Sequence, residues 1–220
     1  FNIYNIMLVL SSYGLPMAVS KLVSARFTKK RYKSAAKVLR CSLMVAVCTG
    51  GIAALLVFFG ASFIENVIYG GGLPGLAIPL RILAPTIFLV AILGVIRGFF
   101  QGQSTMIPTA VSQILEQIVN AIVSIAAGYG MMKAFASSPD VAALGTAMGA
   151  LTAVLFMGFL YAVYTPTFNR LKRKDRHTEN QSTGQICKII IYTMIPIILG
   201  QTFYQISALI DDVMFSNIMV

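Results

Sequence analysis

The sequence of 220 residues is 57% hydrophobic and only 11% charged, whereas an average soluble protein has about 25% charged residues. Its net charge of +10 would suit a nucleic-acid-binding protein, but the basic residues flank long apolar stretches and do not cover a polar surface. Composition therefore excludes an ordinary soluble domain and argues against nucleic acid as a partner.

Two basic clusters bound the apolar middle of the chain. The first consists of Lys29, Lys30, Arg31, Lys33, Lys37 and Arg40, and the second of Arg170, Lys172, Arg173, Lys174 and Arg176. Apolar stretches of about 20 residues separated by short cationic loops are typical of polytopic membrane proteins. Basic loops stay in the cytoplasm, so the chain must cross the membrane an even number of times between the clusters. The sequence predicts an all-α polytopic transmembrane helical bundle.

The first apolar stretch runs from Phe1 to about residue 23 and ends at the basic loop 26–40, which we expect to be helical in part. Lys21 and Arg26 close this stretch on its cytoplasmic side, and we consider them candidates for a cytoplasmic gate. A second stretch over about 41–64 leads to an outer turn at residues 70–75, GGGLPG. Because the chain starts within an apolar stretch and stops abruptly at Val220, we expect it to be an internal piece of a larger protein.

Three more apolar stretches complete the first bundle. One covers about 78–98, and the polar segment 98–108 connects it to the next, which begins at Pro108 and runs to about Met132. Residues 133–141 form a second outer turn before the stretch 142–164. The sequence thus predicts an N-terminal bundle over 1–165, a basic cytoplasmic linker over 166–188, and the first span of a second bundle over 189–220.

Small residues at four-residue spacing predict close contact between helices. They occur at Gly94, Gly98 and Gly102, and again at Gly145 and Gly149. For the second pair we expect packing alone. The first run crosses the junction between a span and a polar segment, so a hinge is the alternative there.

A polar stripe runs along the stretch that begins at Pro108. Gln113, Glu116, Gln117 and Asn120 share one helical face, and Ser124 extends it. Glu116 lies roughly 12 Å into the helix at 1.5 Å per residue, and a carboxylate facing lipid at that depth costs a few kcal/mol. The stripe must face other helices or water. Four strong polar groups in two turns favour a hydrated cavity wall over interhelical hydrogen bonding.

Other polar residues fall within the spans. Arg81 and Arg97 lie towards opposite ends of one stretch, and we expect Arg97 to extend its guanidinium to the headgroups. In the last stretch Gln201 and Gln205 share a face. A cavity lined by Arg, Lys and Gln suits an anionic, hydrogen-bonding headgroup such as a sugar pyrophosphate.

The sequence contains no recognisable enzymatic or metal-binding motif. The P-loop, GxSxG, HExxH and CxxC patterns are absent, and the seven acidic residues are scattered along the chain. Cys41, Cys48 and Cys187 have no metal-ligand spacing, and His177 stands alone in a charged segment. We therefore expect neither an enzyme nor a bound metal or other cofactor.

Three stretches resemble the polysaccharide-transporter branch of the multidrug/oligosaccharidyl-lipid/polysaccharide (MOP) exporter superfamily. GLPMAVSKLVSARFTKKRYKSAAKVLR (14–40) resembles its second span and the following loop. RILAPTIFLVAILGVIRGFFQGQSTMIPTAVSQILEQIVNAI (81–122) resembles the fourth and fifth spans of its stage V sporulation protein B and lipid II flippase members. ILGQTFYQISALIDDVMF (198–215) resembles the seventh span.

The resemblance implies a 14-span, two-bundle transporter in the bacterial cytoplasmic membrane, of which this chain supplies about spans two to seven. It implies alternating access, a lipid-linked oligosaccharide of the undecaprenyl-pyrophosphate type such as lipid II as substrate, and membrane lipids and cell-wall synthesis proteins as partners. A multidrug/cation antiporter and a non-transporting scaffold for cell-wall synthesis are the alternatives. The candidate cavity residues are Arg81, Arg97, Gln101, Gln113, Glu116, Gln117, Asn120, Gln201, Gln205 and Asp211.

Overall fold

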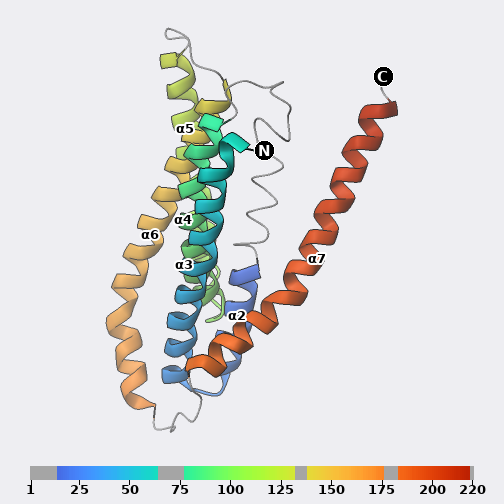
Figure 1. Cartoon of the computed structure of the whole chain (residues 1–220). Coiled ribbons are helices and arrows are strands. Elements are labelled where there is room, and N and C mark those ends of the chain that lie inside the picture. The colour runs from blue at the N-terminus through green and yellow to red at the C-terminus, as the bar shows by residue number, and fades with distance from the viewer. Residues whose placement is uncertain (1–13, 64–76, 132–137, 176–182, 219–220) are drawn as a thin grey trace.

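Six helices make up the part of the chain that this computed structural model describes, residues 14–63, 77–131, 138–175 and 183–218 (Figure 1). They are α2 (Gly14–Thr28), α3 (Tyr32–Phe63), α4 (Ala77–Gln101), α5 (Ile107–Met131), α6 (Ser138–Lys174) and α7 (Thr183–Ile218). Five of them contain segments long and apolar enough to cross a membrane. The all-α polytopic bundle predicted from the sequence is confirmed, and these ranges contain no strand.

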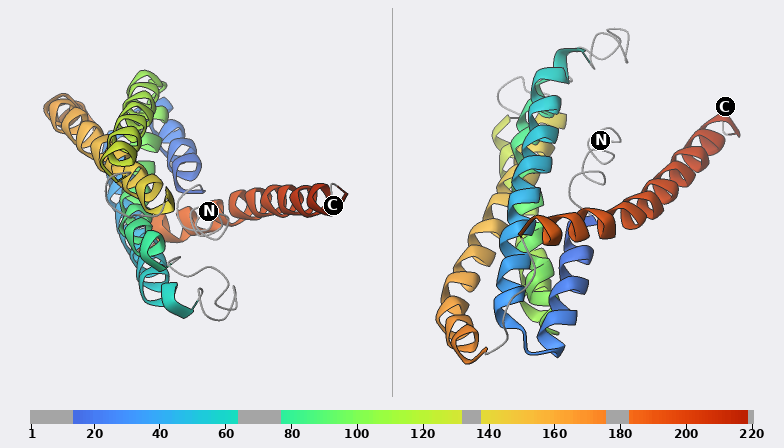
Figure 2. Two further views of the ribbon diagram at one scale, coloured as in Figure 1. Left: turned by 90° about the horizontal axis from the view of Figure 1, so that it is seen from above. Right: turned by 60° about the horizontal axis from the view of Figure 1, so that its bottom comes forward.

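Helices α3 to α6 run side by side, and α2 packs along their lower half (Figure 1). Helix α7 contacts α2 and α3 near its start and then diverges from the bundle, as both views in Figure 2 show. Pro196 lies inside α7, and a proline removes one backbone hydrogen bond and bends a helix. The first bundle is therefore a packed unit from which α7 departs.

The basic segment 26–40 is helical in part, as predicted, and the connections within both basic segments are shorter than the predicted loops. Helix α2 continues to Thr28 and α3 begins at Tyr32, so only residues 29–31 connect them. Helix α6 continues to Lys174, and residues 175–182 separate it from α7, instead of the predicted 166–188. The physical reason is that basic side chains in the last turn of a helix interact favourably with its dipole, so the backbone need not leave the helix where the charges begin.

The helix borders at the opposite end differ less from expectation. Helix α6 already begins at Ser138, so the end of the predicted outer turn 133–141 is helical. Three predicted segments lie outside the described residues: the other outer turn at 70–75, residues 133–137, and the beginning of the first apolar stretch.

The main core lies where α2, α3, α4, α6 and α7 meet. Leu15, Val19 and Val23 of α2 are fully buried in it. At its lower end Phe27 stacks on Phe168 of α6 with ring centroids 6.1 Å apart, and Phe99 of α4 meets the same ring edge-on at 5.3 Å. Aromatic pairs in these arrangements add about 0.5–1.5 kcal/mol to the burial of their surface.

One glycine on α4 and one directly after it allow α2 to approach this part of the backbone closely. A Cβ atom at Gly98 would lie 2.6 Å from the carbonyl oxygen of Pro16, and one at Gly102 would lie 2.7 Å from Cβ of Val23 and 2.8 Å from the oxygen of Ser20. The close packing predicted from their spacing is therefore confirmed for these two glycines.

A carboxylate ties the end of α6 to the start of α3. Asp175 is buried, and its Oδ2 accepts a hydrogen bond of 2.9 Å from the backbone N–H of Lys33. In the neighbouring turn, Arg26 donates from Nε to Oγ of Ser34 at 2.9 Å and from Nη1 to the carbonyl of Leu22 at 3.0 Å. Backbone N–H groups in the first turn of a helix have no intrahelical acceptor, so Asp175 satisfies one of them and also opposes the helix dipole.

We expect both basic segments to face the cytoplasm. A cysteine at exposed Lys30 or Lys174 should resist an impermeant thiol reagent in intact cells, whereas a cysteine at Gly72 or Ser138 should react. Ser34 is unsuitable as a labelling position because it is buried beside Arg26. Labelling is measured in a protein without Cys41, Cys48 and Cys187, and reaction at Lys30 from outside would refute this topology.

Candidate functional site

The connection between α4 and α5 brings the end of one helix beside the start of the next. Helix α4 ends at Gln101 and α5 begins at Ile107, with Ser104 in the left-handed region at φ 62°. Pro108, in the first turn of α5, needs no hydrogen-bond acceptor there. A connection this short forces the two helices to run antiparallel.

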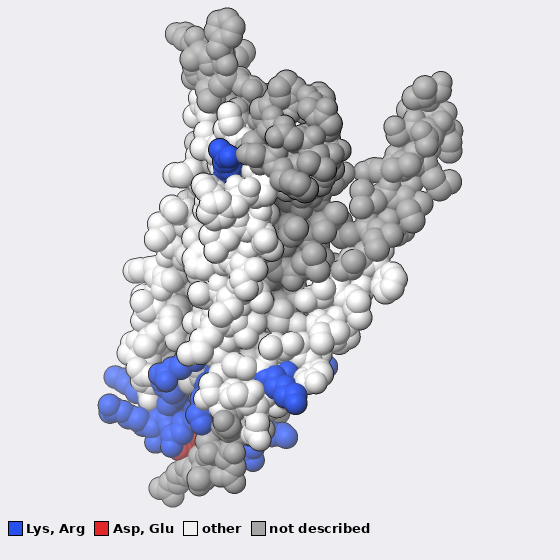
Figure 3. Space-filling view, in the orientation of Figure 1, with Lys and Arg blue, Asp and Glu red and all other residues white. Residues whose placement is uncertain are grey.

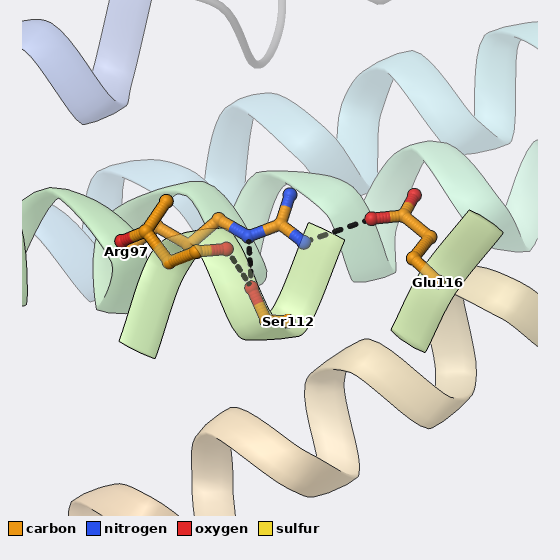
Figure 4. Close-up of polar contacts among 4 residues, drawn as sticks. Arg97, Ser112 and Glu116 are labelled. Atoms are coloured by element: carbon orange, nitrogen blue, oxygen red, sulfur yellow. Dashed lines mark hydrogen bonds and ion pairs between the residues drawn. The ribbon is translucent and has the colours of Figure 1, made fainter. Parts of the chain in front are cut away.

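Arg97 of α4 binds two side chains of α5 (Figure 4). Its Nη2 lies 2.8 Å from Oε2 of Glu116, forming an ion pair, and its Nε donates to Oγ of Ser112 at 2.9 Å. The hydroxyl of Ser112 donates in turn to the carbonyl of Thr109 at 2.8 Å. The guanidinium is thus held by two acceptors that lie one turn apart on α5.

This ion pair lies within two predicted membrane spans, residues 78–101 and 107–129. The side chains of Arg97 and Glu116 are 13% and 21% exposed. Charged groups within membrane spans pair with each other because each alone is costly in hydrocarbon. The expectation that Arg97 reaches the headgroups is therefore wrong, since its guanidinium turns to α5, where a carboxylate neutralises it.

The polar stripe of α5 divides into two parts. Its first part packs against the glycines of α6. A Cβ atom at Gly149 would lie 2.7 Å from the carbonyl oxygen of Glu116, and one at Gly145 would lie 2.6 Å from Oδ1 of Asn120 and would also collide with Oγ of Ser124. Glu116, Asn120 and Ser124 therefore lie in a contact between helices, which was the alternative to a cavity wall.

The second part of the stripe is Gln113 and Gln117, whose side chains are exposed. They lie between the face of α5 that packs on α6 and a fully apolar exposed face that includes Ile114, Ile118 and Ile122. The prediction that this stripe lines a hydrated cavity therefore remains only for the amides of Gln113 and Gln117.

The remaining candidates lie apart from the ion pair. Arg81 is exposed and 16 residues before Arg97 on α4, which corresponds to about 24 Å along the helix. Gln101 ends the same helix and is half-buried, as is Gln201 of α7, while Lys21 is exposed on α2. Arg26 is engaged in the α2–α3 turn. The side chains of Gln205 and Asp211 lie outside the described part of α7.

The profile of a protein family described as "Polysaccharide biosynthesis protein" matches residues 1–219, nearly the whole chain. The chain belongs to this family. This match, with the relatives and the solved structure described next, confirms the predicted placement in the polysaccharide-transporter branch of the MOP superfamily. It also confirms the predicted location, which is the bacterial cytoplasmic membrane with several membrane crossings.

Curated relatives from Bacillus subtilis (strain 168) cover parts of the chain. The lipid II flippase MurJ is 36% identical over 141 residues, which are 61% of this chain and 26% of MurJ. Stage V sporulation protein B is 33% identical over 111 residues, 50% of this chain and 21% of that protein. The membrane protein YabM is 26% identical over 210 residues, 94% and 37% of the two chains. The chain thus spans between a fifth and two fifths of these family members.

A solved structure shares the fold. It is an inward-facing conformation of a multidrug resistance MATE family transporter of the MOP superfamily, with a TM-score of 0.66 and 18% identity. The match covers 94% of this chain and 45% of that one. The helices of this chain are therefore arranged as in the matching part of that transporter.

Ser112 and the partners of the α6 glycines were not predicted from the sequence. Ser112 stands four residues before Glu116, so the spacing alone placed both on adjoining turns of one face. Nothing in the sequence indicated that Arg97 would meet both. In the described residues no three His, Cys, Asp or Glu side chains lie close enough to hold a metal ion.

We expect single cysteines along residues 109–125 to show two kinds of behaviour. Positions 113 and 117 should react with a small hydrophilic thiol reagent, because their side chains are exposed and polar groups there favour water. Positions 112, 116 and 120 should react slowly, because Arg97 and α6 cover them. A profile with maxima at 114, 118 and 122 would show that water does not reach the amides.

Proposed function

We propose that the full-length protein translocates a lipid-linked oligosaccharide cell-wall precursor of the undecaprenyl-pyrophosphate type, such as lipid II, from the inner to the outer leaflet. The observation that carries this proposal is the 36% identity with a lipid II flippase in a chain that the family profile matches over residues 1–219. A pyrophosphate and its sugars cannot cross about 30 Å of hydrocarbon unaided. A shielded polar path is what such a transporter must supply.

No covalent step is required for this function. A transporter of this kind alternates between inward- and outward-open states, and the substrate needs only different affinities for the two. We propose that the exposed amides of Gln113 and Gln117 hydrogen-bond sugar or peptide groups. Arg81, whose guanidinium can bind a phosphate with two hydrogen bonds, is our first candidate for the pyrophosphate.

Arg97 is a weaker candidate for contact with phosphate. Its guanidinium is already bound by Glu116 at 2.8 Å and Ser112 at 2.9 Å. A phosphate would have to displace Glu116 and leave that carboxylate unpaired in the membrane. We therefore assign the pair to holding α4 and α5 together.

The same pair argues against a multidrug/cation antiporter. A carboxylate that binds a cation in a membrane cavity must not already be paired with a basic side chain. Among the described side chains of the membrane spans, the acidic one is Glu116, and Arg97 neutralises it. A scaffold function in cell-wall synthesis would require no polar cavity at all, so the transport test below distinguishes it.

The test is rescue of a bacterium depleted of its lipid II flippase. The wild-type full-length protein should restore translocation of the precursor, and Arg81→Ala and the double variant Gln113→Ala/Gln117→Ala should reduce it about tenfold or more, as expected when hydrogen bonds to charged or polar substrate groups are lost. Lys30→Ala removes a charge in the α2–α3 turn and should leave translocation unchanged.

Amounts of protein in the membrane are compared for all variants by immunoblot. Normal translocation by both cavity variants would refute the residue assignment but not the function. Failure of the wild-type protein would instead point to another lipid-linked sugar, which rescue of strains lacking other sugar-lipid exporters would identify.

A further inference from the structure

A basic groove lies between the start of α3 and the end of α6. The described residues that line it are Lys33, Asn169, Lys172 and Arg173, and its volume is about 600 Å³. Figure 3 shows that Lys and Arg side chains gather at the lower end of the visible face, below a middle part that is almost uncharged. The groove presents three cationic groups and an amide, and none of these four residues is acidic.

One of the cations is held in place by the core. The Nζ atom of Lys172 lies 5.2 Å from the centre of the Phe168 ring, and Phe168 is buried in the core between α2, α4 and α6. A cation over an aromatic ring gains about 0.5–1 kcal/mol at an exposed position. The ammonium group is therefore positioned at the groove before any ligand arrives.

The helix face that leads to the groove on α6 changes from apolar to polar. Leu155 and Phe159, each 65% exposed, share this face with Asn169 and Arg173, because at about 100° per residue all four fall within an arc of roughly 80°. From Phe159 to Arg173 the helix rises about 21 Å.

Helix α3 has the same arrangement. Lys33 and Arg40 share a face with Met44 and Val47, which are 60% and 45% exposed, at spacings of 7, 4 and 3 residues. Each of the two helices that border the groove thus carries basic groups at this end and exposed apolar side chains farther along the same face. This combination matches a phosphate group joined to long hydrocarbon chains, whereas a free phosphate or an acidic peptide would leave the apolar faces without a function.

We propose that this groove binds an anionic phospholipid of the inner leaflet. Its phosphate lies among Lys33, Lys172 and Arg173, and its acyl chains lie along the apolar faces of α3 and α6. Basic pockets between membrane helices on the cytoplasmic side are suited to anionic headgroups, and Arg173 can hold the phosphate with two parallel hydrogen bonds. The lipid fixes the depth of the bundle in the membrane and binds α6 to α3. This site is independent of the transported substrate.

The experiment is native mass spectrometry of the purified full-length protein with phosphatidylglycerol or phosphatidylcholine of identical acyl chains. The wild-type protein should prefer phosphatidylglycerol. Lys172→Gln/Arg173→Gln should weaken the binding of phosphatidylglycerol about thirtyfold, since each direct contact of a basic residue with the phosphate contributes roughly a factor of five. The matched control Lys29→Gln/Lys30→Gln removes the same charge from the same end of the bundle and should change binding less than about twofold.

Two further arms complete the test. Leu155→Gln/Phe159→Gln should weaken the binding of phosphatidylglycerol, because the acyl chains contribute to binding. For the same reason, millimolar inorganic phosphate should not displace the bound lipid. If Lys172→Gln/Arg173→Gln is not monodisperse on size-exclusion chromatography, Arg173→Gln replaces it with an expected fivefold effect. Equal affinity of the wild-type protein for both lipids, equal weakening by both charge variants, or full displacement by phosphate would each refute the proposal.

Discussion

Replacing Glu116 with alanine is expected to destabilise the bundle by about 2–3 kcal/mol, because the guanidinium of Arg97 then remains in the membrane without its carboxylate. For a domain of this size that corresponds to a fall of roughly 5–10 °C in the midpoint of thermal unfolding. The midpoint is measured in detergent micelles as the temperature at which half of the protein is still monodisperse on size-exclusion chromatography.

A double replacement distinguishes loss of the pair from loss of either residue. Arg97→Met/Glu116→Leu removes both charges and keeps apolar volume, so its midpoint should return to within about 3 °C of the wild-type value. Gln113→Ala, an exposed position one turn away, is the control and should have little effect. A double variant as unstable as Glu116→Ala would show that the loss does not come from an unpaired Arg97 charge in the membrane.

The second large effect is expected at Gly145. The Cβ atom of Gly145→Ala would lie 3.0 Å from the carbonyl oxygen of Asn120 and 2.6 Å from its Oδ1. The backbone oxygen cannot move without α5, so the two helices must separate, at a cost of about 1–3 kcal/mol. The midpoint should fall by roughly 3–9 °C.

Gly158→Ala is the matched control on the same helix. No atom lies within 4 Å of the Cβ position at Gly158, and alanine is favoured over glycine in a helix by about 0.5–1 kcal/mol. This variant should therefore raise the midpoint by roughly 1–3 °C. Equal destabilisation at both glycines would show that α5 does not pack on Gly145 in the way the structure places it.

The membrane spans and the even number of crossings could be predicted from the sequence, because the backbone polar groups of a segment in hydrocarbon must be paired within a helix. The length of the loops in the basic segments could not be predicted in the same way. Residues 170–174 were assigned to a loop because they are charged, but Lys, Arg and Leu are good helix formers. Their intrinsic preference and their favourable interaction with the helix dipole both let α6 continue to Lys174.

The candidate site was predictable only in part. Helical periodicity placed Gln113, Glu116 and Asn120 on one face, and the structure agrees that they lie along one side of α5. Periodicity in one helix does not determine which neighbour that face meets. The pairing of Arg97 with Glu116 depends on the geometry of the α4–α5 connection, and the burial of Asn120 depends on Gly145 of α6, which lies 25 residues later in the chain.

The ion pair between α4 and α5 has a consequence for how the protein enters the membrane. Arg97 and Glu116 are 19 residues apart in the chain, and at about 5–20 residues per second the ribosome produces Arg97 roughly 1–4 s before Glu116. During that interval Arg97 has no carboxylate to bind, and its charge alone is costly in hydrocarbon. We therefore expect α4 and α5 to reach their final depth together, as a hairpin whose two charges leave the water as a neutral pair.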